Sequence, residues 1–203
     1  EKKRLAVALL SLVLLSGCTT SQGHVSDISE TDIALPIVHT SENPTVSRVV
    51  AMANGSAEII AALGYRSILV GRDVASSIPE LSSVPIDNPG HTISVERVLS
   101  QKPDLVLIDA NSSPQSSIDT LKKSGIRFII ISNPFNLTDV GAKEQQVATA
   151  IGTPRAGQAL VSQITQVSYP VSKIKVAFLY IRGTSSIYLI GGKGSGADSL
   201  LST

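Results

Sequence analysis

Three side chains from two distant parts of the sequence could together form an iron-binding centre. His91 lies at the end of a long loop, and Tyr180 ends an apolar run with Arg182 two residues further on. Imidazole and phenolate are both axial ligands of haem iron. Residues two apart in a strand share a face, so the Arg182 guanidinium can lower the phenol pKa of Tyr180 and favour the phenolate. Tyr188 is the alternative oxygen ligand, although its place inside the next apolar run favours packing.

A glycine-rich loop from Gly191 to Gly196 follows that next apolar run. The backbone N–H groups of such a loop, here at Gly192 and Gly194, can bind an anionic group of a ligand. Gly192, Gly194 and Ala197 also fit a G-x-G-x-x-A pattern, but the order of a phosphate-binding P-loop is absent. We therefore expect contact with a carboxylate group of the ligand and keep nucleotide binding as the weaker alternative.

The single cysteine of the chain, Cys18, has a chemical role of its own. Lys2, Lys3 and Arg4 precede an apolar stretch from Leu5 to Leu15, and the sequence Leu-Ser-Gly-Cys follows. This stretch is too short to span a bilayer as a mature helix, and its basic flank is typical of a signal peptide. Small residues before a cysteine indicate a lipobox, at which the Cys18 thiol takes a diacylglycerol. A plain signal peptide is the alternative.

Strand and helix patterns alternate through the rest of the chain, which predicts an α/β fold with a parallel sheet. Ser56 and Ser94 are the expected N-caps of two of the helices. Ligands of such sheets bind at the carboxyl ends of the strands. The predicted strands are 48–52, 68–70, 104–109, 127–131, 175–180 and 186–190, and the predicted helices are 57–63, 94–99, 116–123, 139–151 and 154–167.

These elements divide the chain into five parts. We expect a lipoprotein signal peptide at 1–17, a lipid anchor and flexible tether at 18–47, a first α/β lobe at 48–152, a helical connector at 153–172 and the start of a second α/β lobe at 173–203. The last part has too few residues to bury its own strands, so we expect the second lobe to be truncated.

The chain resembles the class III solute-binding proteins, which serve haem, cobalamin and ferric-siderophore importers. The resemblance rests on RVVAMANGSAEIIAALG, ILVGRD and SVERVLSQKPDLVLID, and it covers about residues 46–203. It implies a two-lobed fold with a helical interlobe connector. The segments GHTISVERVL and FLYIRGTSSIYLIGGKGSGADSLL are similar to the haem-binding branch, which presents a His or Tyr near His91 and a tyrosine–arginine pair like Tyr180 and Arg182. The family's second lobe is longer than the one here.

The resemblance also implies partners. We expect haem as the transported ligand, an ABC permease and ATPase complex as the docking partner, and a monomer held by its lipid anchor at the outer face of the cytoplasmic membrane. Glu96, in the first turn of the 94–99 helix, is the expected contact with permease arginines, and Glu58 is a weaker candidate. The simpler alternative for Glu96 is a favourable interaction with the helix dipole.

Composition limits the other functions. The net charge of +1 argues against nucleic-acid binding, and aromatic residues at 3% with no tryptophan weigh against a cobalamin or siderophore binder, which remains the alternative in the same class. A zinc carrier would need several clustered histidines. An extracytoplasmic hydrolase is the remote alternative, but the G-x-S-x-G motif is absent, so we expect no enzymatic activity.

Overall fold

The computed structural model describes residues 35–88, 92–110, 112, 114–134, 136–164, 177–181 and 187–201. The chain divides into two compact units, Glu1–Ile33 and Ala34–Thr203, and all the described residues belong to the second unit. No helix in these described ranges is long and apolar enough to cross a membrane.

Five parallel strands form the sheet of the lobe. They are β1 (Val49–Ala51), β2 (Leu69–Asp73), β3 (Ile86–Asn88), β4 (Leu105–Asp109) and β5 (Arg127–Ile131). Their order is β3-β2-β1-β4-β5, so the chain leaves β1 toward one edge and returns to place β4 on its other side. In α/β sheets, ligands bind at the carboxyl ends of the strands, in the crevice where the strand order reverses.

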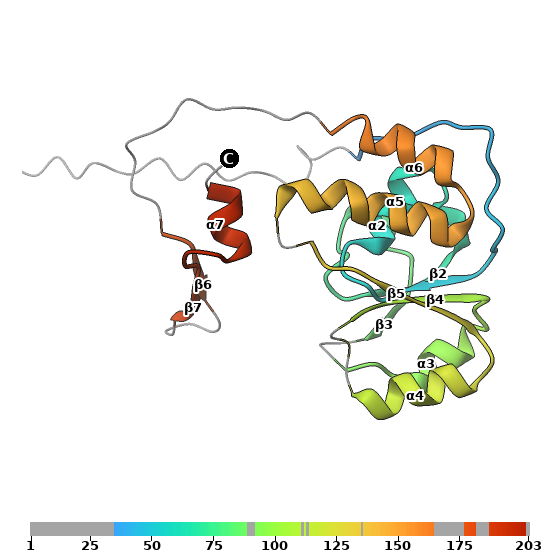
Figure 1. Cartoon of the computed structure of the whole chain (residues 1–203). Helices are drawn as coiled ribbons and strands as arrows, with labels where there is room; N and C mark the ends of the chain where they lie inside the picture. Colours follow the sequence, from blue (N-terminus) through green and yellow to red (C-terminus); the bar gives the residue numbers. More distant parts are fainter. Residues whose placement is uncertain are drawn as a thin grey trace, which may run out of the picture. The chain divides into compact units, whose positions relative to one another are not determined.

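Two helical layers cover the sheet, as Figure 1 shows. One face carries α2 (Ser56–Ala62), α5 (Val140–Ile151) and α6 (Pro154–Val161), and the other carries α3 (Val95–Ser100) and α4 (Gln115–Lys123). Side chains alternate along β1, because Val49 and Ala51 pack in the first layer while Val50 and Met52 pack in the second. Both faces of the strand are therefore buried, as apolar runs in parallel sheets predict.

Short 3-10 helices complete the lobe. They are η3 (Arg66–Ile68), η4 (Pro79–Leu81) and η5 (Leu137–Asp139). The sequence does not predict strand β3, because its segment reads as part of a polar loop, yet Arg72 pairs with Ile86 across the ladder. Helix α6 is shorter than its pattern predicts and ends at Val161.

The predicted helix starts are confirmed only in part. Pro154 begins α6 as expected, where its missing N–H costs nothing. The prediction for Ser56 is wrong: the N-cap is Gly55, whose φ of 75° is left-handed, and the Ser56 hydroxyl donates to the carbonyl oxygen of Ala53. Ser94 is at the N-cap of α3, but its side chain makes no capping hydrogen bond.

The predicted tether extends too far along the chain. Residues 35–47 pack against the lobe, and Val38 and Val46 belong to its apolar core. The Val38 N–H donates to the carbonyl oxygen of Ala62, and the Thr45 N–H to that of Ile151. Two apolar side chains, Val38 and Val46, anchor this largely exposed segment on the lobe, so the part of 18–47 that can serve as a tether ends before residue 35.

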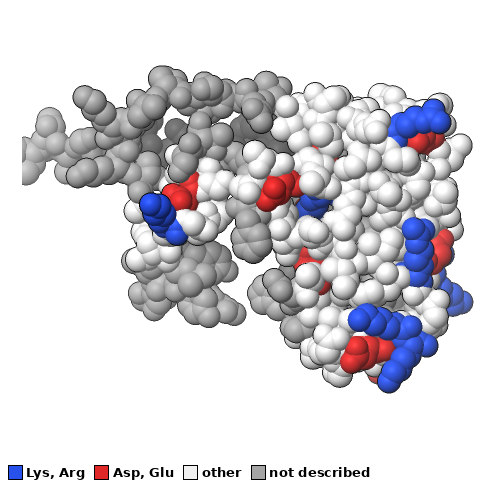
Figure 2. Space-filling view, viewed as in Figure 1, with Lys and Arg blue, Asp and Glu red and all other residues white. Residues whose placement is uncertain are grey.

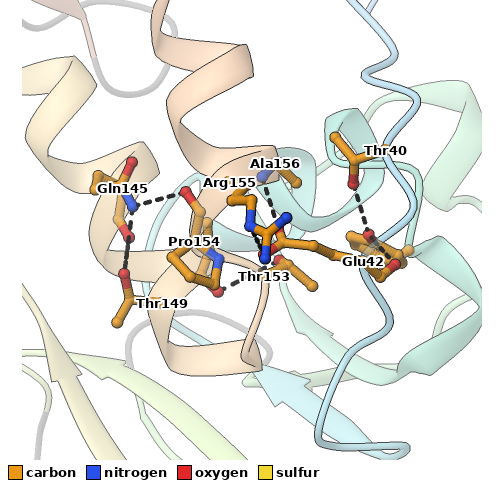
Figure 3. A network of polar contacts seen from close by, with 10 residues as sticks. Thr40, Glu42, Gln145, Thr149, Thr153, Pro154, Arg155 and Ala156 are labelled. Carbon is orange, nitrogen blue, oxygen red and sulfur yellow. Dashed lines mark hydrogen bonds and ion pairs between the residues drawn. The ribbon is translucent and has the colours of Figure 1, made fainter.

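A carboxylate from this segment caps α6, as Figure 3 shows. Oε2 of Glu42 accepts the backbone N–H of Ala156 at 2.8 Å, and its Oε1 lies 3.8 Å from Nε of Arg155. The Tyr65 hydroxyl donates to the carbonyl oxygen of Glu42 at 2.7 Å. A negative charge at a helix N-terminus is favourable, so the Glu42 carboxylate fastens this segment to α6, and Tyr65 holds the Glu42 backbone.

The C-terminal described residues form a separate small sheet. Strands β6 (Leu179–Ile181) and β7 (Ile187–Ile190) pair antiparallel, with Tyr180 opposite Leu189, and α7 (Gly196–Leu201) follows. Both strands lie where the sequence predicts them, although β6 begins later than residue 175. The expected connector is described up to residue 164, and its remainder lies outside the described residues.

Candidate functional site

A pocket of about 390 Å³ opens at the carboxyl ends of β1 and β5. Loops that follow these strands supply part of its wall, and the first turns of α2 and α5 supply the rest. The pocket therefore lies at the edge of the sheet where the parallel topology predicts a ligand. The lining residues are Asn54, Gly55, Ile59, Asn133, Pro134, Val140, Lys143 and Glu144.

The turn after β1 is held against the end of β4. The Asn54 N–H donates to Oδ2 of Asp109 at 3.0 Å, and the N–H groups of Met52 and Ala53 both donate to the carbonyl oxygen of Leu107. Gly55 then turns the chain into α2 with its left-handed φ of 75°. This side of the pocket is thus fixed by backbone hydrogen bonds.

Lys143 joins the two strand-end loops of the pocket. Its side chain is 7% exposed, and Nζ donates to the carbonyl oxygen of Asn54 at 2.5 Å and to Oδ1 of Asn133 at 3.2 Å. Burial lowers the pKa of the Lys143 ammonium, and nearby carboxylates oppose this shift, those of Asp109, Asp73 and Glu58 in that order. A buried cation with several carboxylates near it stays charged more readily than an isolated one.

A second buried polar cluster lies beside this lysine. Oγ of Ser76 is 2.6 Å from Oε2 of Glu58 and also hydrogen-bonds Oδ1 of Asp73. Burial raises the pKa of Asp73, and the charge of Glu58 raises it further, against the opposing hydrogen bond of Ser76. Because a hydroxyl carries one proton, it can donate to only one of the two carboxylates at a time. The raised pKa of Asp73 fits this shared contact, because a protonated Asp73 would not compete for the hydroxyl proton.

Arg72 organises the loop between β2 and β3. Its side chain is 7% exposed, and Nε donates to the carbonyl oxygens of Leu81 and Val84, both at 3.1 Å. Nη1 donates to the carbonyl oxygens of Asp73 and Ser76. Five-donor guanidinium groups satisfy several buried carbonyls at once. The loop expected to lead toward His91 is thus packed around an arginine.

Glu144 brings a further carboxyl group to the pocket wall. Its Oε2 is buried and has no hydrogen-bond partner among the described residues. Burial raises the pKa of Glu144 above its usual value. The wall therefore combines apolar side chains with a lysine, two asparagines and this carboxyl group.

Exposed basic residues gather away from the pocket. Figure 2 shows Lys and Arg side chains over the layer of α3 and α4 and the neighbouring edge of the lobe. Lys122 and Lys123 are exposed in the last turn of α4, where the helix dipole favours cations, and Arg127 begins β5. These positions mark the amino-terminal edge of the sheet, opposite the pocket.

The structure places one predicted side chain clearly and leaves others unplaced. Glu96 is exposed in the first turn of α3, in the layer on the opposite face of the sheet from the pocket helices. Cys18, His91 and Arg182 lie outside the described residues. Tyr180 and Tyr188 are placed in β6 and β7 by their backbones alone. That His91 and Tyr180 bind the same iron centre thus remains a prediction.

Hydrogen bonds within residues 192–198 hold the glycine-rich loop together. The Gly194 N–H donates to Oδ2 of Asp198 at 2.8 Å, and the Ser195 N–H donates to the carbonyl oxygen of Gly192. A carboxylate therefore occupies the Gly194 N–H that the sequence predicts to contact the ligand. The space beside Gly192 is open, because a Cβ there would meet no described atom within 4 Å. Among the described residues, no group of three His, Cys, Asp or Glu side chains is arranged to hold a metal ion.

Sequence reasoning did not find the pocket residues Asn54, Asn133 and Lys143. The two asparagines each follow a predicted strand, which is the available signal, because polar residues after parallel strands often contact ligands. Lys143 gave no signal, since it lies within a helix pattern where lysine is ordinarily solvated.

A family model described as "Periplasmic binding protein" matches residues 49–203. Among solved structures, the chain is similar to heme binding protein HmuT, with a TM-score of 0.66 and 27% identity over 88% of this chain and 63% of that one. It is also similar to the periplasmic heme-binding protein RhuT from Roseiflexus sp. RS-1, with a TM-score of 0.65 and 28% identity over 77% of this chain and 63% of that one.

Two curated relatives also match the chain. It is 25% identical over 170 residues to the ABC transporter substrate-binding lipoprotein YvrC of Bacillus subtilis, which covers 78% of this chain and 54% of the relative. It is 28% identical over 121 residues to the vitamin B12-binding protein of Yersinia pestis, which covers 59% of this chain and 42% of the relative. The chain thus spans about half the length of these relatives.

Proposed function

Because this chain belongs to the periplasmic binding protein family, we propose that it is the extracytoplasmic subunit of an ABC importer that captures ferric haem between two lobes. Haem is proposed as the ligand because the chain is similar to heme binding protein HmuT. The pocket at the carboxyl edge of the sheet supports a ligand at that edge. The role is carriage to a permease, with no reaction on the ligand.

In this proposal His91 and Tyr180 are the axial ligands of the haem iron, one on each face of the porphyrin. Two axial ligands leave no open coordination position, which suits carriage. Arg182 favours the phenolate form of Tyr180 by lowering its pKa. The N–H of Gly192 is the remaining candidate contact for a propionate, since the Gly194 N–H is engaged by Asp198.

Cobalamin is the second candidate ligand. It is supported by the likeness to the vitamin B12-binding protein of Yersinia pestis. The charges near the pocket also favour it, because the carboxylates of Asp109, Asp73 and Glu58 act on the ammonium of Lys143 and offset its charge. An uncharged corrin amide is repelled less by these carboxylates than a haem propionate.

Optical titration of the purified protein, carrying a complete second lobe, with haemin and with cyanocobalamin tests the proposal. We expect haemin to give a Soret shift with the charge-transfer bands of a tyrosinate-bound ferric haem, and cyanocobalamin to bind more weakly. Tyr180→Ala should lower haem affinity more than His91→Ala, since only the phenolate pairs its charge with ferric iron. His91→Ala should shift the spectrum and leave haem bound. Haem binding that is unchanged in both variants would contradict the assigned ligands.

A further inference from the structure

We propose that Asn133 and Lys143 form a hydrogen-bond donor site in the pocket and bind an oxygen acceptor at the edge of the tetrapyrrole. The inference deepens the proposed function and rests on it. It assigns the pocket residues a role in ligand specificity, separate from the axial ligands of the metal.

The lysine fixes which way the asparagine amide faces. Nζ of Lys143 lies 3.2 Å from the Asn133 side chain, and an ammonium can only donate. The atom that faces Lys143 must therefore be the acceptor Oδ1, so Nδ2 points elsewhere. The Asn133 side chain is exposed and lines the pocket. Its two amide protons are thus available to a ligand.

The ammonium itself has one donor left. It carries three N–H groups, and the described residues accept two of them, through the carbonyl oxygen of Asn54 and Oδ1 of Asn133. Lys143 is 7% exposed and lines the pocket, so a buried acceptor would gain a charge-assisted hydrogen bond there. The amino-terminal end of α5, which holds Val140 at the pocket wall, adds the positive end of a helix dipole.

The amide of Asn133 and the remaining N–H of Lys143 can both donate to an oxygen acceptor of the ligand. The apolar wall of Ile59, Pro134 and Val140 suits the body of a flat macrocycle. The oxygen can be a propionate carboxylate of haem or a carboxamide carbonyl of a corrin. Both accept the same hydrogen bonds, and they differ in charge.

The experiment replaces each donor and checks that each variant folds. Asn133→Asp substitutes an acceptor for the amide donors at an exposed position, and the new carboxylate can still accept from Lys143. Lys143→Met removes the ammonium. Lys123→Met is the matched control, because Lys123 is exposed in the last turn of α4 away from the pocket. Thermal unfolding of each variant checks the fold, and titration with haemin and cyanocobalamin measures affinity.

We expect Asn133→Asp to weaken the bound probe by about tenfold or more, the loss expected for hydrogen bonds with a charged partner. Lys143→Met should weaken it similarly, and Lys123→Met should leave it unchanged. A loss for haemin identifies a propionate as the acceptor, and a loss for cyanocobalamin identifies a carboxamide. Wild-type binding with a folded, unaffected Asn133→Asp variant overturns this inference alone. A wild-type protein with a complete second lobe that binds neither probe overturns the proposed function and this inference with it.

Discussion

The carboxyl group of Asp87 lies directly over the backbone of Gly71, and a Cβ at Gly71 would collide with it. Asp87 is 1% exposed, and its Oδ2 has no hydrogen-bond partner among the described residues. Burial raises the pKa of Asp87 to about 6, against a hydrogen bond from Gln101 and the charge of Arg97. The absence of a side chain at Gly71 in β2 thus makes room for the buried carboxyl group that Asp87 of β3 carries.

This buried acid should make stability depend on pH. The carboxyl of Asp87 binds its proton more tightly in the folded chain, where its pKa is about 6, than in the unfolded chain, where the pKa is about 3.9. The resulting stabilisation is complete below about pH 4 and is lost as pH rises through 6. Asp87→Asn should remove this dependence and raise the free energy of unfolding by about 1–3 kcal/mol at pH 8.

Urea unfolding at pH 4.5, 6 and 8 measures this effect. Asp119→Asn is the control, because Asp119 is exposed on α4. If wild type and Asp87→Asn show the same pH profile, the carboxyl of Asp87 does not titrate in the folded state as we expect.

The contact of Gly71 with Asp87 predicts a non-additive pair of substitutions. Gly71→Ala should lower the free energy of unfolding by about 1–3 kcal/mol, because the methyl group overpacks a filled site. In an Asp87→Ala background the same change should cost much less, since the colliding atoms are gone. Chemical unfolding of the four proteins completes the cycle. Equal costs in both backgrounds would show that the carboxyl of Asp87 is not the obstacle.

The cap that Glu42 provides to α6 should be measurable. Glu42→Gln keeps the shape of the side chain and removes the charge that faces the N–H of Ala156 and the guanidinium of Arg155. We expect it to lower the free energy of unfolding by about 0.5–1.5 kcal/mol, as loss of a helix cap usually does. Glu80→Gln, an exposed acid on η4, should leave stability unchanged. Equal stability of Glu42→Gln and wild type would contradict a capping role.

Much of this lobe is predictable because its apolar runs are dense and regular. The run from Leu105 to Asp109 and the proline that begins α6 indicate the positions of β4 and α6 directly. Strand β3 escapes prediction because its three residues include Asp87 and Asn88, which ordinarily mark loops. Its formation depends on pairing with β2, and such a tertiary contact leaves no periodic signal.

The pocket is less predictable than the sheet. Its location at the strand ends follows from parallel α/β topology, but the residues that fill it come from contacts far apart in sequence. Lys143 reaches the carbonyl oxygen of Asn54 across 89 positions of the chain. Glu42 likewise contacts Ala156, 114 positions further along the chain. Because such a contact leaves no local pattern, the sequence of this segment predicts a flexible tether.

Cys18 provides a test of the predicted lipid anchor. If Cys18 takes a diacylglycerol, Cys18→Ala should abolish incorporation of labelled palmitate and release the protein from the membrane or leave it as an unprocessed precursor. Cys18→Ser keeps the size of the side chain and should behave in the same way, because the hydroxyl does not replace the thiol as the lipid acceptor. Membrane retention of a fully processed Cys18→Ala protein would contradict the prediction.

We expect Glu96 to contact the permease and to take no part in ligand binding. It is exposed in the first turn of α3, and this helix packs on the opposite face of the sheet from α2 and α5, which line the pocket. Glu96→Ala should therefore leave haemin affinity within about twofold, since rim charges alter ligand binding little at a distance, while haem uptake by cells carrying the variant falls severalfold. Asp119→Ala, an exposed acid on α4 in the same layer, is the control and should support normal uptake. Normal uptake by Glu96→Ala would remove this residue from the docking surface, and lost haemin binding with an intact fold would place it in the ligand site instead.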